Sequence, residues 1–133
     1  MVKFPSEEWI KSFKDELNKN KYYQEVAKNW EGDFIFVVSP DNSLKTETKF
    51  YVDLWHGKCR DAYLIKNNKK AAFVFKGFYS NWKRVIKKDL DPIRGLIRGM
   101  FTLEGDSKII LEQTKAAQEL VNTASKITVE FEV

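Results

Sequence analysis

The pattern of apolar and polar positions in residues 82–106 predicts a helix, a short helix, a strand and the start of another helix. Asp91 and Pro92 predict the start of a short helix, because Asp91 can cap free backbone N–H groups and Pro92 suits a first turn that needs no donor. Apolar residues then recur at spacings of three, four and seven, which is typical of one helix face: Ile93, Leu96, Ile97 and Met100. Gly99 is expected to end this helix. Its apolar inner side either covers an ordinary core or forms a wall around an apolar ligand.

The pattern changes to a period of two after this helix. Phe101 and Leu103 alternate with polar residues, which predicts a half-buried strand. Gly105 and Asp106 are expected to turn the chain and cap a further helix, residues 107–124. Its expected inward residues are Ile110, Leu111, Ala117, Leu120, Val121 and Ala124. On the other side of the segment, Gly77 is expected to end a strand and Ser80 to cap a helix that contains Trp82, Val85 and Ile86.

The first half of the chain predicts two helices followed by four closely spaced strands. Residues 5–8 open a helix whose apolar stripe is Trp9, Ile10, Phe13 and Leu17, and a second short helix is expected at residues 22–30. Strands are expected at residues 34–39, 50–55, 59–65 and 71–76. The first is a continuous apolar run, so it is expected to be buried on both faces. The turns between the strands predict an antiparallel meander, and residues 127–133 predict a last strand.

The order of these elements carries a family resemblance. An apolar strand, a glycine, a helix with a tryptophan, Asp-Pro, a short apolar helix, Gly-x-x-x-Leu-x-Gly-Asp and a long helix follow one another. The residues that carry it are Phe73, Phe75, Gly77, Trp82, Val85, Ile86, Asp91, Pro92, Gly99, Leu103, Gly105, Asp106, Ile109, Ala116, Ala117 and Leu120. The chain resembles the sterol carrier protein 2 family, most closely over residues 73–120 and more loosely back to residue 5. The resemblance implies one α+β domain, residues 1–133, with a curved, mainly antiparallel sheet of five to six strands, covering helices and an apolar tunnel.

The resemblance also implies a function and a site. It predicts non-catalytic binding and transfer of apolar lipids, such as fatty acyl chains, acyl-CoA or sterol-like molecules, without a cofactor. By matched position, the wall of the tunnel is expected to consist of Trp82, Ile86, Ile93, Leu96, Ile97, Met100, Phe101, Phe73, Phe75, Leu111 and Leu120. Met100-Phe101 stands where the family often has Lys-Leu, and the short helix is bulky, so we expect acyl chains to fit better than sterols.

An interaction module with a filled core is the alternative. In that interpretation the apolar surface and the C-terminal strand, residues 127–133, bind a protein or a second copy of the chain. The composition suits both, because ten Phe, five Tyr and four Trp predict either a large aromatic core or a lined cavity.

Several classes of protein are not expected from the composition. No apolar run approaches the ~20 residues of a membrane helix, and a single cysteine excludes an internal disulfide framework. The N-terminus MVKFPSEEW has no apolar signal-peptide region, and the C-terminus FEV is not the peroxisomal Ser-Lys-Leu. A cytoplasmic location is therefore expected.

The net charge of +4 is concentrated in residues 83–98, which hold six cations and two anions. The cations are Lys83, Arg84, Lys87, Lys88, Arg94 and Arg98. One interpretation is peripheral docking to an anionic membrane surface, and the other is a plain solvated face. Nucleic acid is not expected as a partner, because no exposed aromatic residues need be interleaved with these charges.

His56 and Cys59 are the single histidine and cysteine, three residues apart around a glycine turn. They are the strongest candidates for catalysis or for half of a zinc site. A Cys–His dyad needs an orienting group, for which Asp53 or Asp61 is available, and a zinc site needs two further ligands. The pattern favours hairpin residues with no catalytic or metal-binding role, so we expect no enzyme activity. A Cys59-dependent enzyme is the weakest alternative.

Overall fold

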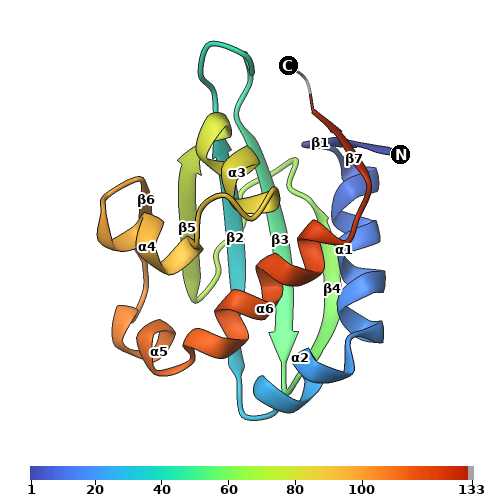
Figure 1. Ribbon diagram of the computed structural model, residues 1–133, viewed down its shortest axis with the longest axis vertical. Helices are drawn as coiled ribbons and strands as arrows, with labels where there is room; N and C mark the ends of the chain where they lie inside the picture. The colour runs from blue at the N-terminus through green and yellow to red at the C-terminus, as the bar shows by residue number, and fades with distance from the viewer. Residues whose placement is uncertain (132–133) are drawn as a thin grey trace.

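The computed structural model describes residues 1–131 and contains a five-stranded sheet with helices packed on one side (Figure 1). The strands are β2 (Glu31–Ser39), β3 (Thr48–Trp55), β4 (Lys58–Leu64), β5 (Phe73–Phe78) and β6 (Phe101–Glu104). Their order across the sheet is β4-β3-β2-β5-β6. The predicted α+β class is confirmed, and the five strands of this sheet agree with the predicted five to six.

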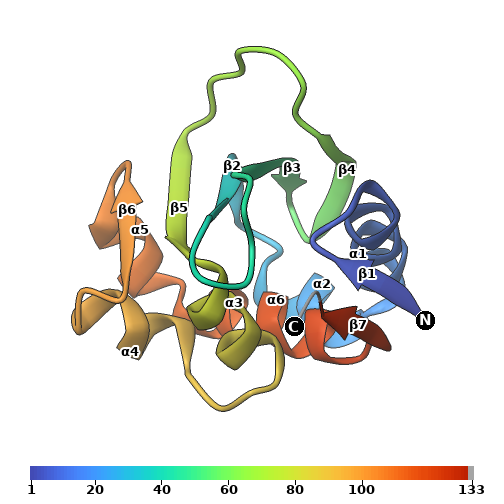
Figure 2. The same cartoon turned by 90° about the horizontal axis from the view of Figure 1, so that it is seen from above.

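The predicted meander is wrong at one point. Strand β5 does not follow β4 in the sheet but pairs in parallel with β2, with Phe34 opposite Phe73. All other pairs within this sheet are antiparallel. Residues 65–72 carry the chain in an arch over one face of the sheet, as Figure 2 shows. The apolar run of β2 explains the arrangement, because a strand buried on both faces is stable in the centre of a sheet with a partner on each edge.

The helices are α1 (Glu7–Lys19), α2 (Lys21–Val26), α3 (Tyr79–Ile86), α4 (Pro92–Ile97), α5 (Ser107–Glu112) and α6 (Thr114–Ser125). Helices α3, α4 and α6 lie on the face of the sheet opposite the arch (Figure 2). Helix α1 packs against β4, where the Asn18 side chain accepts a hydrogen bond from Cys59 N at 2.8 Å and donates one to Cys59 O at 2.9 Å. Asn18 thereby satisfies backbone groups on the outer edge of the sheet.

The predicted caps of α4 and α5 are confirmed, but that of α3 is wrong. Asp91 accepts from Arg94 N and Asp106 from Lys108 N. Ser80 lies within α3, whose N-cap Phe78 has no side-chain acceptor. Instead, Asp41 in the loop between β2 and β3 accepts from Ser80 N at 2.7 Å. A residue 39 positions away in the sequence therefore provides the cap that was expected of Ser80.

Three other boundaries differ from the sequence expectation. The expected helix at residues 107–124 is two helices, because Gln113 leaves helical geometry with φ −110° and ψ 36°. Trp30 lies beyond the end of α2. Gly77 lies inside β5, where a Cβ atom would come within 2.4 Å of the Phe101 ring. Glycine at this position lets Phe101 pack directly on the strand backbone.

The chain ends pair with each other. Strand β1 (Val2–Phe4), which the sequence did not indicate, runs parallel to β7 (Val129–Phe131), with Val2 opposite Val129. The predicted last strand, residues 127–133, is confirmed for Val129–Phe131, whereas residues 127–128 precede it and residues 132–133 lie outside the described part of the chain. Within residues 1–131, every helix is too short or too polar to cross a membrane.

Strand β2 is buried on both faces, as predicted. Phe34, Phe36 and Val38 face the helices and belong to the main core. Ile35 and Val37 face the other way and form a small second cluster with Tyr51, beneath the arch. The two faces of the sheet are therefore covered by different material, helices on one side and mainly a single loop on the other.

Candidate functional site

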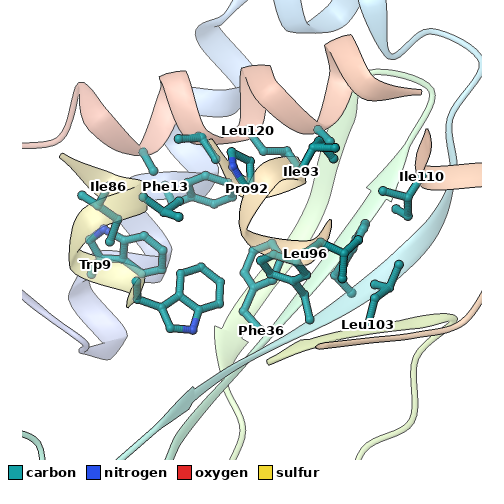
Figure 3. Close-up of a pocket in the computed structure, with 17 residues that line it drawn as sticks. Trp9, Phe13, Phe36, Ile86, Pro92, Ile93, Leu96, Leu103, Ile110 and Leu120 are labelled. Carbon is teal, nitrogen blue, oxygen red and sulfur yellow. The ribbon is translucent and has the colours of Figure 1, made fainter. Parts of the chain in front are cut away.

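A cavity of about 70 Å³ lies between the helices and the sheet. Its lining is apolar throughout and comes from both layers (Figure 3): Trp9, Phe13, Phe34, Phe36, Phe75, Trp82, Val85, Ile86, Pro92, Ile93, Leu96, Leu103, Ile110, Ala117, Leu120, Val121 and Ala124. None of these lining residues is charged. The cavity is smaller than the apolar cavity of about 150 Å³ that holds one benzene molecule in an engineered protein.

Aromatic contacts hold the floor of the cavity. The Trp82 ring lies 5.6 Å from that of Phe36 and 5.7 Å from that of Phe75, and its indole N–H donates to Val37 O at 2.9 Å. Phe101 also contacts this group: its ring stacks on that of Phe75 with centroids 4.6 Å apart and lies edge-on to that of Trp82 at 5.4 Å. These contacts hold Trp82 on both its apolar and its polar side.

The structure brings together part of the wall expected from the resemblance. Of the expected wall residues, those that line the cavity are Phe75, Trp82, Ile86, Ile93, Leu96 and Leu120. Phe73 and Phe101 are buried behind the lining, and Met100 packs at the border of the main core. A continuous tunnel stays a prediction, because what the structure contains is this small cavity.

Ile97 and Leu111 are corrections to the expected wall. Their exposed fractions are 73% and 51%, so both side chains face solvent. Helix α4 has only six residues, and its inner side is already formed by Ile93 and Leu96. In α5, Ile110 is the buried residue, and its neighbour Leu111 is rotated by about 100° on the helix.

Residues from distant parts of the sequence complete the lining. Trp9 and Phe13 come from α1, and Phe34 and Phe36 from β2, which the resemblance did not assign to the site. For Trp9 and Phe13 the available sequence signal was the apolar stripe of α1, because an apolar helix face is normally buried against another element. The Trp9 indole nitrogen is buried with no hydrogen-bond partner within the described chain, and its ring meets that of Phe4 edge-on at 4.7 Å.

The cavity approaches solvent between α4 and α6. Its deep residues, such as Phe13 and Trp82, are buried, whereas Ile93 and Leu96 on α4 and Leu120 on α6 remain partly exposed. A side-chain hydrogen bond spans this side of the cavity, from Gln118 Nε2 to Asp91 Oδ1 at 3.4 Å. We call this region, made by Ile93, Leu96, Leu103, Ala117, Leu120 and Val121, the mouth of the cavity.

The six expected docking cations lie on α3, on α4 and directly after them. Lys83 and Lys87 place their ammonium groups over the rings of Tyr79 and Phe131, at 4.8 and 5.1 Å. Arg84, Lys88, Arg94 and Arg98 are exposed. None of these last four forms an ion pair with a residue in the described range 1–131. The structure therefore leaves cationic groups on the side of the molecule that holds the cavity.

His56 and Cys59 engage separate partners. His56 Nε2 lies 2.6 Å from Glu31 Oε2 at the surface. Cys59 is buried, and burial raises the pKa of its thiol to about 12 despite the opposing effects of Lys14 and the Asp61 backbone. A thiol in that state is not a nucleophile at neutral pH.

The expected orienting acids are also engaged elsewhere. Asp53 accepts two hydrogen bonds from Arg60, each at 3.1 Å, and Asp61 accepts from Ala62 N. Within residues 1–131, no cluster of three or more His, Cys, Asp or Glu residues could hold a metal ion. The hairpin therefore offers no assembled catalytic group around His56 or Cys59.

A second hollow lies on the opposite face of the sheet. It has a volume of about 280 Å³, with an aliphatic floor of Ile35, Val37 and Val74 and a wall from Ile65. Its remaining lining is polar: Glu47, Lys49, Asn67, Asn68, Lys69, Lys76 and Glu104. We call it the arch groove. The arch groove is larger than the cavity but half polar, so it is not suited to an apolar chain.

Comparison with known proteins agrees with the fold. The sequence pattern of the SCP-2 sterol transfer family matches residues 10–131. The chain belongs to this family, whose members bind and transfer lipids. No curated protein matches the sequence.

Solved structures give the same result. A crystal structure of sterol carrier protein 2 is 31% identical with a TM-score of 0.85, over 92% of this chain and 98% of that one. A conserved hypothetical protein of Thermus thermophilus, described as possibly a sterol carrier protein, is 29% identical with a TM-score of 0.88, over 98% and 93% of the two chains. Sterol carrier protein 2 of Yarrowia lipolytica, at 17% identity and a TM-score of 0.58 over 89% and 90%, shares the fold.

Proposed function

We propose that this chain binds the apolar part of a lipid in the cavity between helices and sheet and transfers it without catalysis. The observation that carries the proposal is the lining itself, which is apolar throughout, in a chain of a lipid-binding family. Each methylene that leaves water for such a lining gains about 0.8 kcal/mol. A chain of several methylenes therefore gains enough to bind without any specific polar contact.

The cargo we favour is a flexible acyl chain, free or as an ester, rather than a sterol. A cavity of about 70 Å³ is too small for either without movement of its wall. The floor is fixed by the contacts of Trp82, whereas the mouth is made of partly exposed aliphatic side chains. An acyl chain can widen such a mouth one methylene at a time, while a rigid ring system requires the full width at once.

Membrane docking is the second part of the proposal. The cations Lys83, Arg84, Lys87, Lys88, Arg94 and Arg98 lie in α3 and α4 or within two residues of their ends, and both helices contribute to the cavity. Attraction to anionic lipids would bring the mouth to a bilayer. Because surface charges are screened over about 10 Å at 0.1 M salt, vesicle binding is expected to weaken steeply with salt.

The small cavity volume favours one alternative, the interaction module with a filled core. In that case the described chain would associate through surface groups, for example with a second copy through β7, which pairs with β1 along one edge. This alternative predicts a dimer and no bound lipid.

Native mass spectrometry with lipid extraction of the purified protein separates the two functions. The lipid-carrier proposal predicts an added mass on wild type that extraction identifies as an acyl lipid, and its loss in the variant Leu96→Trp, whose indole would occupy the cavity. Wild type without added mass, after incubation with fatty acid as well, would exclude the lipid-carrier proposal. A dimer without lipid would establish the interaction module.

A further inference from the structure

Helix α4 has two chemically different sides. Its inner side, Pro92, Ile93 and Leu96, lines the cavity. Its outer end carries Ile97, which is 73% exposed, and its last turn and C-cap carry the exposed cations Arg94 and Arg98. Apart from Met1, Ile97 is the most exposed large hydrophobic residue in the described range.

In its exposed position Ile97 adds little to the apolar burial that stabilises the fold. An isoleucine gains about 1.5–3 kcal/mol when it is fully buried, and the neighbouring Leu96 has taken the inner position. Cations beside an exposed aliphatic residue are the pattern of segments that lie in the interface of an anionic membrane. Arg94 and Arg98 have no acidic partner within residues 1–131, so they are available for lipid phosphate or carboxylate groups.

The attachment of α4 allows it to move at the mouth. Gly99 follows the helix with φ +77°, and a side chain there would meet no atom within 4 Å, so nothing packs over this turn. The side-chain bond that ties the start of α4 to α6 is the exposed one between Asp91 and Gln118, at 3.4 Å. Gly95 is the packed point, where a Cβ would lie 3.0 Å from the Phe101 ring.

We propose that α4 is the gate of the cavity and that an anionic membrane surface opens it. Arg94 and Arg98 bind lipid headgroups, Ile97 enters the acyl layer, and α4 turns about its packed point at Gly95, away from α6. The mouth then faces the bilayer, and an acyl chain can pass from the membrane to the cavity without crossing water. This inference rests on the proposed lipid-binding function and assigns the site's membrane contact.

The membrane contact is tested with Ile97→Ser and the matched control Leu111→Ser, which removes another exposed aliphatic residue, 51% exposed, from α5. The probes are vesicles of phosphatidylcholine with and without phosphatidylserine, and a fluorescent fatty acid. Ile97→Ser is expected to weaken binding to the anionic vesicles about tenfold, which corresponds to about 1.4 kcal/mol. Transfer to these vesicles should slow in proportion, while the affinity for the fatty acid in solution stays within about twofold, and Leu111→Ser should resemble wild type.

The charge part is tested with the double variant Arg94→Gln and Arg98→Gln. Its preference for anionic over neutral vesicles is expected to weaken, and its binding should depend less steeply on salt, while Lys83, Arg84, Lys87 and Lys88 keep the remainder of the attraction. The gate part is tested with Gln118→Ala, which removes the bond to Asp91. It should speed fatty-acid binding from solution several-fold without changing vesicle binding.

The outcomes are distinguishable. If wild type binds no fatty acid, the proposed function fails. If it binds fatty acid but Ile97→Ser and Leu111→Ser behave alike on anionic vesicles, the membrane contact at α4 is overturned. An unchanged rate in Gln118→Ala overturns the gate while leaving the membrane contact in place.

Discussion

The two faces of the sheet contrast in what covers them and in the hollow each one holds. The helix face has a cavity of about 70 Å³ with an apolar lining. The other face has the arch groove, about 280 Å³, with an aliphatic floor and lysine, asparagine and glutamate side chains around it. The arch groove is larger but is the poorer lipid site. A bound lipid would exclude water from the polar groups at its rim, and these groups would lose their hydration. The chemistry of the lining therefore identifies the site better than volume does.

The largest expected effect is on the helix face, at Trp82. Its ring contacts three aromatic residues of the floor, and its indole N–H bonds to the backbone of β2. Trp82→Ala should lower the free energy of unfolding by about 3–5 kcal/mol, measured by denaturant titration. On the other face, Tyr51→Phe removes the hydrogen bond to Asp33, 2.7 Å long, and should cost about 1 kcal/mol. An equal loss from both variants would contradict the contrast between the faces.

Val38 and Val37 allow a matched comparison, because they are adjacent in β2 and point to opposite faces. Val38 is fully buried in the main core, and Val37 belongs to the small cluster beneath the arch. Val38→Ala should lower the free energy of unfolding by about 2 kcal/mol and Val37→Ala by about 1 kcal/mol. The ranking reverses only if the arch packs more tightly than the helices do.

The loop at Asp41 links the two layers and makes stability depend on pH. Burial raises the pKa of the Asp41 carboxyl, but hydrogen bonds from the backbones of Ser43, Ser80 and Leu44 outweigh it, so the pKa lies below its ordinary value of 3.8. The ionised form is therefore the stabilising one: its contribution is complete above the ordinary pKa and is lost as pH falls through the lowered value.

Asp41→Ala should cost about 1 kcal/mol at pH 7, as expected for loss of a helix cap. Its deficit relative to wild type should shrink in acid, in thermal melts run from pH 7 down to pH 2. Asn42→Ala, next to it in the loop, is the control and should melt like wild type. A deficit that is the same at every pH would show that the carboxylate charge is not involved.

The smallest expected effect is at the β3–β4 hairpin. His56 and Cys59 have separate partners and lie outside the cavity. His56→Ala and Cys59→Ser should therefore leave the affinity for a fluorescent fatty acid within a few-fold of wild type. Loss of binding in a variant that remains folded, judged by circular dichroism, would assign the hairpin a role that the structure does not indicate.

Local signals predicted the fold best. Asp91-Pro92, Gly99 and Asp106 marked the ends of α4 and the start of α5 correctly, because a cap acts on residues next to it in the chain. The parallel pairing of β5 with β2 was not predictable in the same way. This pairing requires residues 65–72 to cross the sheet, and no residue in that loop indicates such a crossing. The cap of α3 failed for the same reason, since Asp41 acts from a distant loop.

The candidate site was predictable only in part. Spacing placed Ile93, Leu96 and Ile97 on one side of a helix, yet in a helix of six residues it could not decide between Leu96 and Ile97 for the inner position. The contribution of Trp9 and Phe13 depends on how α1 packs across the sheet, a contact between elements far apart in the sequence.

Whether the apolar cavity is the lipid site is tested most simply by equilibrium binding of a fluorescent fatty acid to wild type and two tryptophan variants. Leu96→Trp fills the cavity at its mouth, and Val74→Trp places the same side chain in the arch groove on the opposite face. We expect wild type to bind and Leu96→Trp to lose at least about tenfold in affinity, which is about 1.4 kcal/mol. Val74→Trp should keep an affinity close to that of wild type. Absence of binding by wild type, or loss of binding in Val74→Trp with full binding in Leu96→Trp, would contradict the assignment of the lipid site to the cavity.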